Sequence, residues 1–467
     1  MHKISRRQLL KTVGISSVFF ALPEPLLANT RKPLIIPPLL STKKGKPILL
    51  NLSSIQATLD GQNYVEVWGF NGIYLGPTIK LQSGKFAKIN WQNHLTNEVA
   101  IQIQGLQAMS KLSGGINHKL QPNKSWSPVI PIKQPSATCY YQACSLGKSA
   151  YQNYRGLVGF CLIEDKQDLS NELPNKYGKN DIPLILQDLS LDSSGHQLFN
   201  TESPYFYGDR LFVNGQTTPY VNVGSEIIRL RLLNASLSRS YTIRCDDDRP
   251  FQLLAEDQGF LSTPQSCTSK KIAPGERIEI LVNLMDGKNV SLIANGKNNF
   301  LDKMSAIFDS DYLKDNIILE LRTNGLGAAF PKKSQLTFNN SAQDQNQNIR
   351  LERQLKIDPD AFTINGQKFD SRRIDVNAQA GSIERWIIQV KEPMAFRIQG
   401  AKFFIESQDG KIQPLAQRCW KDTLWINKEA RLIVKFNYRS SNNHPFTFGA
   451  SDLTLADRGC LGLMIVK

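Results

Sequence analysis

The stretch Trp68-Gly69-Phe70-Asn71-Gly72 is the first of three similar segments, and the repetition of this pattern decides the fold. In each segment an Asn-Gly pair follows a short apolar run and precedes a further glycine and a strand-like run. The first segment continues to Gly84 and Phe86 to Trp91. The second is Leu211 to Gly215, with Gly224 and Ile227 to Leu233, and the third is Phe362 to Gly366, with Gly381 and Ile383 to Val390. Asn-Gly suits the positive φ angles of a tight hairpin turn. Three copies about one domain apart predict a repeated domain.

The rest of the chain favours strands over helices. Short runs rich in Val, Ile, Phe and Tyr alternate with Gly, Pro and Asn-Gly turns, and few segments show sustained helical periodicity. Polar stretches separate the repeats at Lys166 to Asn180 and at Thr337 to Ile349. The sequence therefore predicts an all-β chain of three β-sandwich domains, which cover residues 29–168, 175–325 and 350–467.

Composition agrees with a folded chain of this size. A chain of 467 residues is long enough for roughly three domains of ordinary size. Apolar residues make up 41% and charged residues 21%, which argues against a largely disordered protein. The formal net charge is +15, and the whole chain holds only five histidines. So few imidazoles exclude any design that needs many histidine ligands.

The N-terminus has the pattern of an export signal. Ser5, Arg6, Arg7 and Lys11 form a twin-arginine motif ahead of an apolar run from Thr12 to Leu22, which is too short to span a bilayer. We expect a signal peptide over residues 1–28, cleaved after Ala28, with export in the folded state by the twin-arginine translocase to the periplasm. The signal carries a net charge of +3, which leaves the mature chain near +12. An uncleaved anchor or a cytoplasmic basic tail is the alternative.

The seven cysteines are odd in number and lie in the mature chain: Cys139, Cys144, Cys161, Cys245, Cys267, Cys419 and Cys460. A twin-arginine substrate folds in the reducing cytoplasm, which disfavours a disulfide framework. No CxxC or Cys-His zinc spacing is present. Buried apolar thiols are the favoured interpretation for most of them.

Several longer strings resemble the multicopper oxidases. They are Leu75-Gly76-Pro77-Thr78-Ile79, Gly156-Leu157-Val158-Gly159, Arg231-Leu232-Leu233-Asn234-Ala235, Ala273-Pro274-Gly275-Glu276-Arg277 and Asp457-Arg458-Gly459. The resemblance covers essentially all of the mature chain. It implies that the three sandwiches are plastocyanin-like (cupredoxin) domains with Greek-key connections.

The resemblance also identifies where copper ligands would stand, and this chain lacks them. The family uses four His-x-His motifs for a trinuclear cluster, plus two His and one Cys for an electron-entry copper. Amides and aliphatic side chains bind copper poorly. The positions that correspond to those ligands are Gln102, Gln104, Gln142, Cys144, Met394, Arg397, Gln399, Gly449, Ala450, Ser451, Leu455 and Cys460. We therefore expect no catalytic residue, no metal and no cofactor.

No replacement cluster is evident in the sequence. The mature histidines are His94, His118, His196 and His444, and no two are close in sequence. Each lies in a polar or Pro-flanked segment, and we interpret them as exposed or turn residues. Cys144 and Cys460 would be the soft ligands of a residual copper site, which leaves a residual oxidase or a periplasmic copper-binding protein as the alternative function.

Further strings resemble a copper-free group within this superfamily that acts in bacterial cell division. They are Pro37-Pro38-Leu39-Leu40, Val67-Trp68-Gly69, Asn71 to Ile79, Trp420-Lys421-Asp422-Thr423 and Ala456 to Gly459. The resemblance implies a non-enzymatic periplasmic protein that stabilises or protects the division machinery at the septum, especially under stress. Its expected partners are septal proteins, and its positive charge also permits contact with an anionic membrane surface. We expect neither nucleic acid nor a small-molecule substrate as a partner.

Overall fold

A computed structural model describes residues 31–42, 46–165, 173–200, 202–295, 316–325, 336–338, 342 and 348–467. The predicted export signal, with Ser5, Arg6, Arg7, Lys11 and the cleavage after Ala28, lies outside these residues. The described chain consists of strands arranged in six sheets with a few very short helices, so the all-β prediction is confirmed. No helix among the described residues is both long and apolar enough to cross a membrane.

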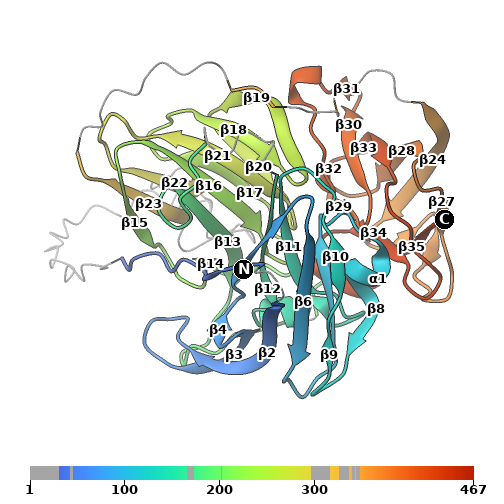
Figure 1. Ribbon diagram of the computed structural model, residues 1–467, viewed down its shortest axis with the longest axis horizontal. Helices are drawn as coiled ribbons and strands as arrows, with labels where there is room; N and C mark the ends of the chain where they lie inside the picture. The colour runs from blue at the N-terminus through green and yellow to red at the C-terminus, as the bar shows by residue number, and fades with distance from the viewer. Residues whose placement is uncertain are drawn as a thin grey trace, which may run out of the picture. The chain divides into compact units, whose positions relative to one another are not determined.

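The first sandwich, blue to cyan in Figure 1, has two sheets of six strands. One sheet has the order β1 (Leu39–Ser41), β5 (Thr78–Gln82), β12 (Val158–Glu164), β11 (Ala137–Ala143), β7 (Val99–Gln104) and β8 (Gly114–Leu120). The other has the order β10 (Val129–Pro131), β6 (Phe86–Asn93), β2 (Ile48–Ala57), β3 (Val65–Phe70) and β4 (Ile73–Tyr74), with β9 (Ser125–Trp126) also paired to β6.

The second sandwich, green to yellow in Figure 1, has sheets of six and five strands. The first has the order β14 (Arg210–Val213), β13 (Asp181–Leu189), β16 (Ile227–Asn234), β21 (Arg277–Asn283), β18 (Phe251–Glu256) and β19 (Gly259–Cys267). The second has the order β15 (Tyr220–Val223), β23 (Ile317–Thr323), β22 (Val290–Ala294), β17 (Tyr241–Cys245) and β20 (Ser269–Ile272).

The third sandwich, orange to red in Figure 1, has sheets of seven and five strands. The larger has the order β26 (Gln367–Lys368), β25 (Thr363–Ile364), β24 (Ile349–Asp358), β28 (Ile383–Val390), β33 (Glu429–Lys435), β30 (Lys402–Gln408) and β31 (Lys411–Ile412). The smaller has the order β27 (Val376–Ala378), β35 (Leu461–Val466), β34 (Phe446–Ala450), β29 (Met394–Ile398) and β32 (Thr423–Ile426). Short helices connect strands: α1 (Ser110–Ser113), α2 (Ser149–Tyr154), α4 (Leu453–Asp457) and the 3₁₀ helix η5 (Leu415–Gln417).

The repeated Asn-Gly segments occupy equivalent places in the three sandwiches. One early strand of each sandwich, β2, β13 or β24, pairs antiparallel with the strand that leads into the Asn-Gly turn. The same strand pairs parallel with the strand that follows the later glycine, β6, β16 or β28. All six turn residues have positive φ, as a tight hairpin turn requires. The sequence repeat is therefore a repeat of strand topology.

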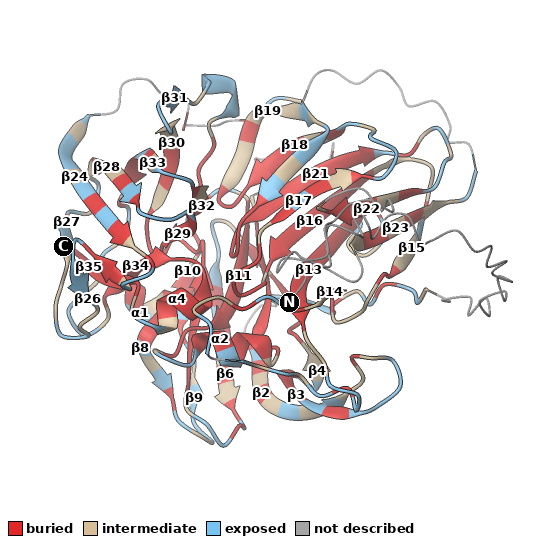
Figure 2. Ribbon diagram, turned by 180° about the vertical axis from the view of Figure 1, so that it is seen from behind, coloured by how far each residue is buried: buried red, intermediate tan, exposed pale blue. Residues whose placement is uncertain are grey.

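Each sandwich encloses its own apolar core, and further clusters join the sandwiches. Alternation places Trp386, Ile388 and Val390 of β28 inside the third core, for example. Figure 2 shows β11, β13 and β16 in red along most of their length, because residues on both of their faces are buried. On the face away from its own core, β11 contributes Tyr140 to a cluster with Ile185 and Leu233 of the second sandwich. The sheets that carry the degenerate copper motifs are thus buried between domains.

Candidate functional site

The four degenerate copper motifs come together where the first sandwich faces the third. Gln102 of β7 and Gln142 of β11 are directly opposite each other in adjacent antiparallel strands. Arg397 of β29 is likewise opposite Gly449 of β34. Two hydrogen bonds cross between the domains: Gln104 Nε2 donates to the Ile398 carbonyl at 3.0 Å, and Gln399 Nε2 donates to the Gly114 carbonyl at 3.0 Å.

Strand alternation explains why these polar side chains share one space. Successive residues of a strand point to opposite faces. Ile101 and Ile103 belong to the first core, so Gln102 and Gln104 point away from it. Phe396 and Ile398 belong to the third core, so Arg397 and Gln399 point toward the first sandwich. All four polar side chains are buried, with at most 4% exposed.

The electron-entry position is filled with apolar packing. Met394, Ala450, Leu455 and Cys460 belong to the same core cluster, and each is at most 1% exposed. Burial raises the pKa of the Cys460 thiol to about 12 and that of the Cys144 thiol also to about 12. Both thiols are therefore protonated at neutral pH in the metal-free protein, and binding copper would require each to lose its proton.

These residues do not fit copper. The trinuclear position offers amides, a glycine, a hydroxyl, the single thiol of Cys144 and a guanidinium. The guanidinium is always charged and has no lone pair to donate, and one thiol does not make a ligand set. The Ser451 hydroxyl already has a hydrogen-bond partner, because it donates to the Pro274 carbonyl at 2.6 Å. Across the described parts of the chain, no group of three or more His, Cys, Asp or Glu residues is placed to hold a metal ion.

Two of the four mature histidines meet in space, although they are far apart in sequence. The rings of His118 and His444 lie 4.2 Å apart between centroids, and His118 also packs against Trp126 at 4.8 Å. Neither is fully exposed. Burial, together with His444, lowers the pKa of His118 to about 4. The interpretation of His118 as an exposed or turn residue was wrong, because it is half-buried within β8, whereas His444 does lie at the end of a turn. Their rings form a packing contact between the first and third sandwiches.

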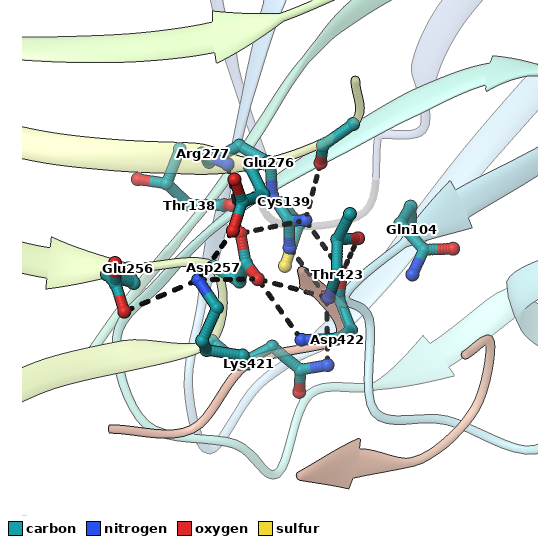
Figure 3. A network of polar contacts seen from close by, with 12 residues as sticks. Gln104, Thr138, Cys139, Glu256, Asp257, Glu276, Arg277, Lys421, Asp422 and Thr423 are labelled. Carbon is teal, nitrogen blue, oxygen red and sulfur yellow. Dashed lines mark hydrogen bonds and ion pairs between the residues drawn. The ribbon is translucent and has the colours of Figure 1, made fainter. Parts of the chain in front are cut away.

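A buried ionic cluster, which the motif search did not anticipate, joins all three domains. Figure 3 shows Arg277 at its centre, with the guanidinium aimed at Asp422. Its Nη1 and Nη2 donate to the two Asp422 carboxylate oxygens at 2.7 Å each, and its Nε donates to the Thr138 carbonyl at 2.8 Å. Thr138, Arg277 and Asp422 belong to the first, second and third sandwiches respectively. Burial alone would raise the pKa of Asp422, but Arg277 lowers it below its usual value.

A second cation completes this cluster. The ammonium of Lys421 lies 3.0 Å from Glu276, 3.3 Å from Glu256 and 3.5 Å from Asp257, and all four side chains are buried (Figure 3). Lys270 also pairs with Glu256, and the opposite charges attract one another within the low-dielectric interior. The strings Ala273 to Arg277 and Trp420 to Thr423, which carry part of the family resemblance, contribute four of the residues. In these two strings, charged residues of both signs stand next to apolar strands, and this mixture was the only local sequence signal of the buried cluster.

A second group of buried ion pairs lies in the second sandwich, on the side that faces the first. Arg231 pairs with Asp181 at 2.7 Å and with Glu279 at 2.9 Å, and it also donates to the Thr138 hydroxyl at 3.1 Å. Burial would raise the pKa of Glu279, but Arg229 and Arg231 lower it to about 2. These ion pairs lie within the second sandwich, and the Thr138 hydroxyl of the first sandwich joins them by accepting from Arg231 and donating to Glu279 at 2.5 Å.

Comparisons with known proteins agree with this architecture. Family profiles described as multicopper oxidase match residues 51–168 and 330–467. Among solved structures, the laccase-like multicopper oxidase CueO from Ochrobactrum sp. superposes with a TM-score of 0.85 at 28% identity, covering 93% of this chain and 100% of that one. The McoA multicopper oxidase of Aquifex aeolicus gives a TM-score of 0.82 at 22% identity, covering 94% and 100%. The predicted cupredoxin-type fold is therefore confirmed.

Curated relatives match over the full length. The cell division protein FtsP of Actinobacillus succinogenes is 52% identical over 99% of both chains. The FtsP proteins of Haemophilus influenzae and Yersinia pestis are 48% and 37% identical, and each alignment covers at least 98% of either chain. The chain therefore belongs to the FtsP family of cell division proteins, which shares the fold of the multicopper oxidases.

Proposed function

We propose that this protein is a non-enzymatic periplasmic cell-division protein that stabilises the division machinery at the septum, especially under envelope stress. The observation that carries the proposal is Arg397, a buried guanidinium at a position where the oxidases of this fold hold a copper ligand. The apolar packing around Met394 and Leu455 at the electron-entry position supports it further. The relatives named cell division protein supply the biological process.

The ionic cluster suits such a role. A scaffold must present one fixed surface to its partners. Buried ion pairs between the second and third sandwiches, with the hydrogen bond from Arg277 to the Thr138 carbonyl of the first, favour a single relative arrangement. The proposed partners are septal proteins, with the twin-arginine translocase acting only during export. The positive charge of the chain supports a second, weaker contact with anionic membrane headgroups.

The absence of oxidase activity is tested with the mature protein. It is expressed with excess copper, and bound metal is then measured together with the oxidation of a phenol and of cuprous ion. We expect less than stoichiometric copper and no turnover. Stoichiometric copper with turnover would instead establish the alternative, a residual oxidase or copper-binding protein.

The cell-division role is tested in a deletion strain. We expect filamentation under envelope stress, and rescue by the wild-type gene but not by an Arg6→Lys/Arg7→Lys variant that stays in the cytoplasm. Normal division of the deletion strain under all such stresses would refute the role.

Partners are identified by crosslinking in cells. Photo-reactive amino acids replace Tyr64, Phe86 or Ile412, which are 74%, 73% and 77% exposed. We expect septal proteins in the adducts from at least one of these positions. Buried Trp386 provides a control position that should give none.

A further inference from the structure

The space that corresponds to the trinuclear cluster contains a buried guanidinium that forms no direct ion pair among the described residues. We define the polar chamber by Gln102, Gln104, Gln142 and Arg397, which are 1%, 0%, 3% and 4% exposed. Tyr140 precedes Gln142 by two residues and Cys144 follows it by two, so all three share one face of β11 and its continuation. Burial raises the pKa values of Tyr140 and Cys144, and in both cases Arg397 acts against that rise. Arg397 also has a side-chain hydrogen bond with Tyr140, so its guanidinium lies over this face.

The carboxylates nearby have other partners. Asp457 accepts hydrogen bonds from the amides of Ser149 and Ala150, at 3.1 and 2.7 Å, and from the Ser149 hydroxyl. Asp422 is held by Arg277. Within the described part of the chain, no ion pair joins Arg397 to a carboxylate. A buried charge is ordinarily paired, because leaving it unpaired costs several kcal/mol.

Hydrogen-bond donors inside the chamber are also unmatched. Arg397 Nη1, Gln102 Nε2 and Gln142 Nε2 are buried and have no partner among the described residues. The unmatched acceptors are Gln102 Oε1 and Gln104 Oε1. Three donors, one of them charged, outnumber two neutral acceptors. Water alone would satisfy the amides but would leave the charge of the guanidinium uncompensated.

We propose that the polar chamber binds a small inorganic anion of halide size, held by Arg397 together with the side-chain amides of Gln102 and Gln142. The anion compensates the guanidinium and accepts the three unmatched hydrogen bonds. In this fold a cationic metal cluster with anionic and neutral ligands is thus replaced by a cationic side chain with an anionic ligand. The site is independent of the proposed division role.

A surface cleft lies beside the chamber. Asp457 of α4 accepts hydrogen bonds from Ser149 and Ala150 of α2, which follows Cys144 closely in the chain, and it lines this cleft of about 600 Å³. Lys148 and Arg458 line the same cleft, and their charge draws anions toward it. We expect exchange of the ion through this cleft, on the side of α2 and α4.

The direct test is anomalous diffraction from crystals of the mature wild-type protein equilibrated with bromide. We expect an anomalous peak within hydrogen-bond distance of Arg397 Nη1 and of the Gln102 or Gln142 amide. A chamber that contains only water at saturating bromide, with no anomalous peak, would overturn the proposal. This measurement needs no variant and so does not depend on how a substitution folds.

A solution test uses thermal unfolding at constant ionic strength, with chloride or bromide replacing a bulky organic anion. We expect the wild-type Tm to rise and then saturate, since the ion binds only the folded state. In Arg397→Gln the rise should disappear, whereas Arg372→Gln, which changes an arginine whose side chain is 90% exposed, should keep it. An equal rise in the wild type and in Arg397→Gln would place the effect elsewhere and contradict the proposal.

Discussion

Arg277 and Asp422 form a two-point ion pair, with both N–O distances at 2.7 Å and both side chains fully buried, between the second and third sandwiches. The bidentate geometry fixes direction as well as distance. Because Arg277 also donates to the Thr138 carbonyl, one guanidinium contacts all three domains. Few other side chains could combine this reach with several rigid donors.

Arg277→Met should destabilise the protein strongly. The change leaves Asp422 and Asp257 buried without the guanidinium between them, and breaking a buried pair on one side typically costs about 3–5 kcal/mol. The free energy of unfolding is measured by urea denaturation. Arg372→Met is the matched control, because the Arg372–Asp370 pair is exposed, and its transition midpoint should stay at the wild-type value. Equal midpoints for the two variants would show that the buried pair contributes nothing.

Gly105→Ala should disturb the same cluster from the first sandwich. A Cβ at Gly105 would lie 2.7 Å from Arg277 Nη2 and 3.1 Å from Asp422 Oδ2, so the ion pair would have to shift. Gly84→Ala is the matched control: both glycines have positive φ, +86° and +76°, but no atom lies within 4 Å of a Cβ at Gly84. Backbone strain is common to both variants, whereas overpacking adds about 1–3 kcal/mol only at Gly105. We expect a clearly lower Tm for Gly105→Ala, and similar Tm values would refute the clash.

The turns of the fold were predictable from local sequence. The Asn-Gly pairs at 71–72, 214–215 and 365–366 adopt positive φ at both residues, because a tight hairpin turn demands that conformation and these residue types tolerate it. The alternation of β28 likewise places Trp386 and Ile388 in the core. Such features depend on neighbours within a few residues, so one sequence suffices to find them.

The contacts between domains were not predictable in this way. Arg277 and Asp422 are 145 residues apart, and His118 and His444 meet although nothing in the sequence links them. The local sequence around a charged residue beside an apolar strand is the same whether its side chain lies in solvent or in a buried ion pair. The family resemblance identified Arg397 as a degenerate copper position, but its burial without a carboxylate partner is visible only from the packing of the first and third sandwiches.

Thiol reactivity should follow burial. Six of the seven cysteines are buried, and Cys267 is partly exposed. Burial raises the pKa of Cys139, Cys144 and Cys245 to about 12, which suppresses the reactive thiolate. With a chromogenic disulfide reagent we expect one fast thiol in the native protein and seven after unfolding. Cys267→Ser should abolish the fast phase, and a second fast thiol in that variant would contradict the assigned burial.

Stability should decline as pH rises from about 4.5 to 7.5, and Asp452 provides the sharpest test. Its carboxylate caps α4 by accepting from the Thr454 and Leu455 amides at 2.9 and 3.0 Å, yet burial raises its pKa to about 6 from 3.8. A pKa raised in the folded state gives stability that is complete below the unfolded pKa and is lost as pH rises through the folded value. A shift of about two units corresponds to about 3 kcal/mol. Below pH 4.5 the lowered pKa of Glu279 acts in the opposite direction, because its stability is lost as pH falls toward 2.

Asp452→Asn separates this titration from the cap itself. Asparagine caps a helix about as well as aspartate but does not ionise, so the substitution removes the charge and keeps the hydrogen bonds to Thr454 and Leu455. We expect the variant to lose the part of the pH dependence between 4.5 and 7.5 that Asp452 supplies, and to exceed the wild type in unfolding free energy at pH 7.5. Urea denaturation at half-unit pH steps measures both curves. If they ran parallel across this range, Asp452 would titrate at its ordinary pKa, and burial of this cap would carry no electrostatic cost.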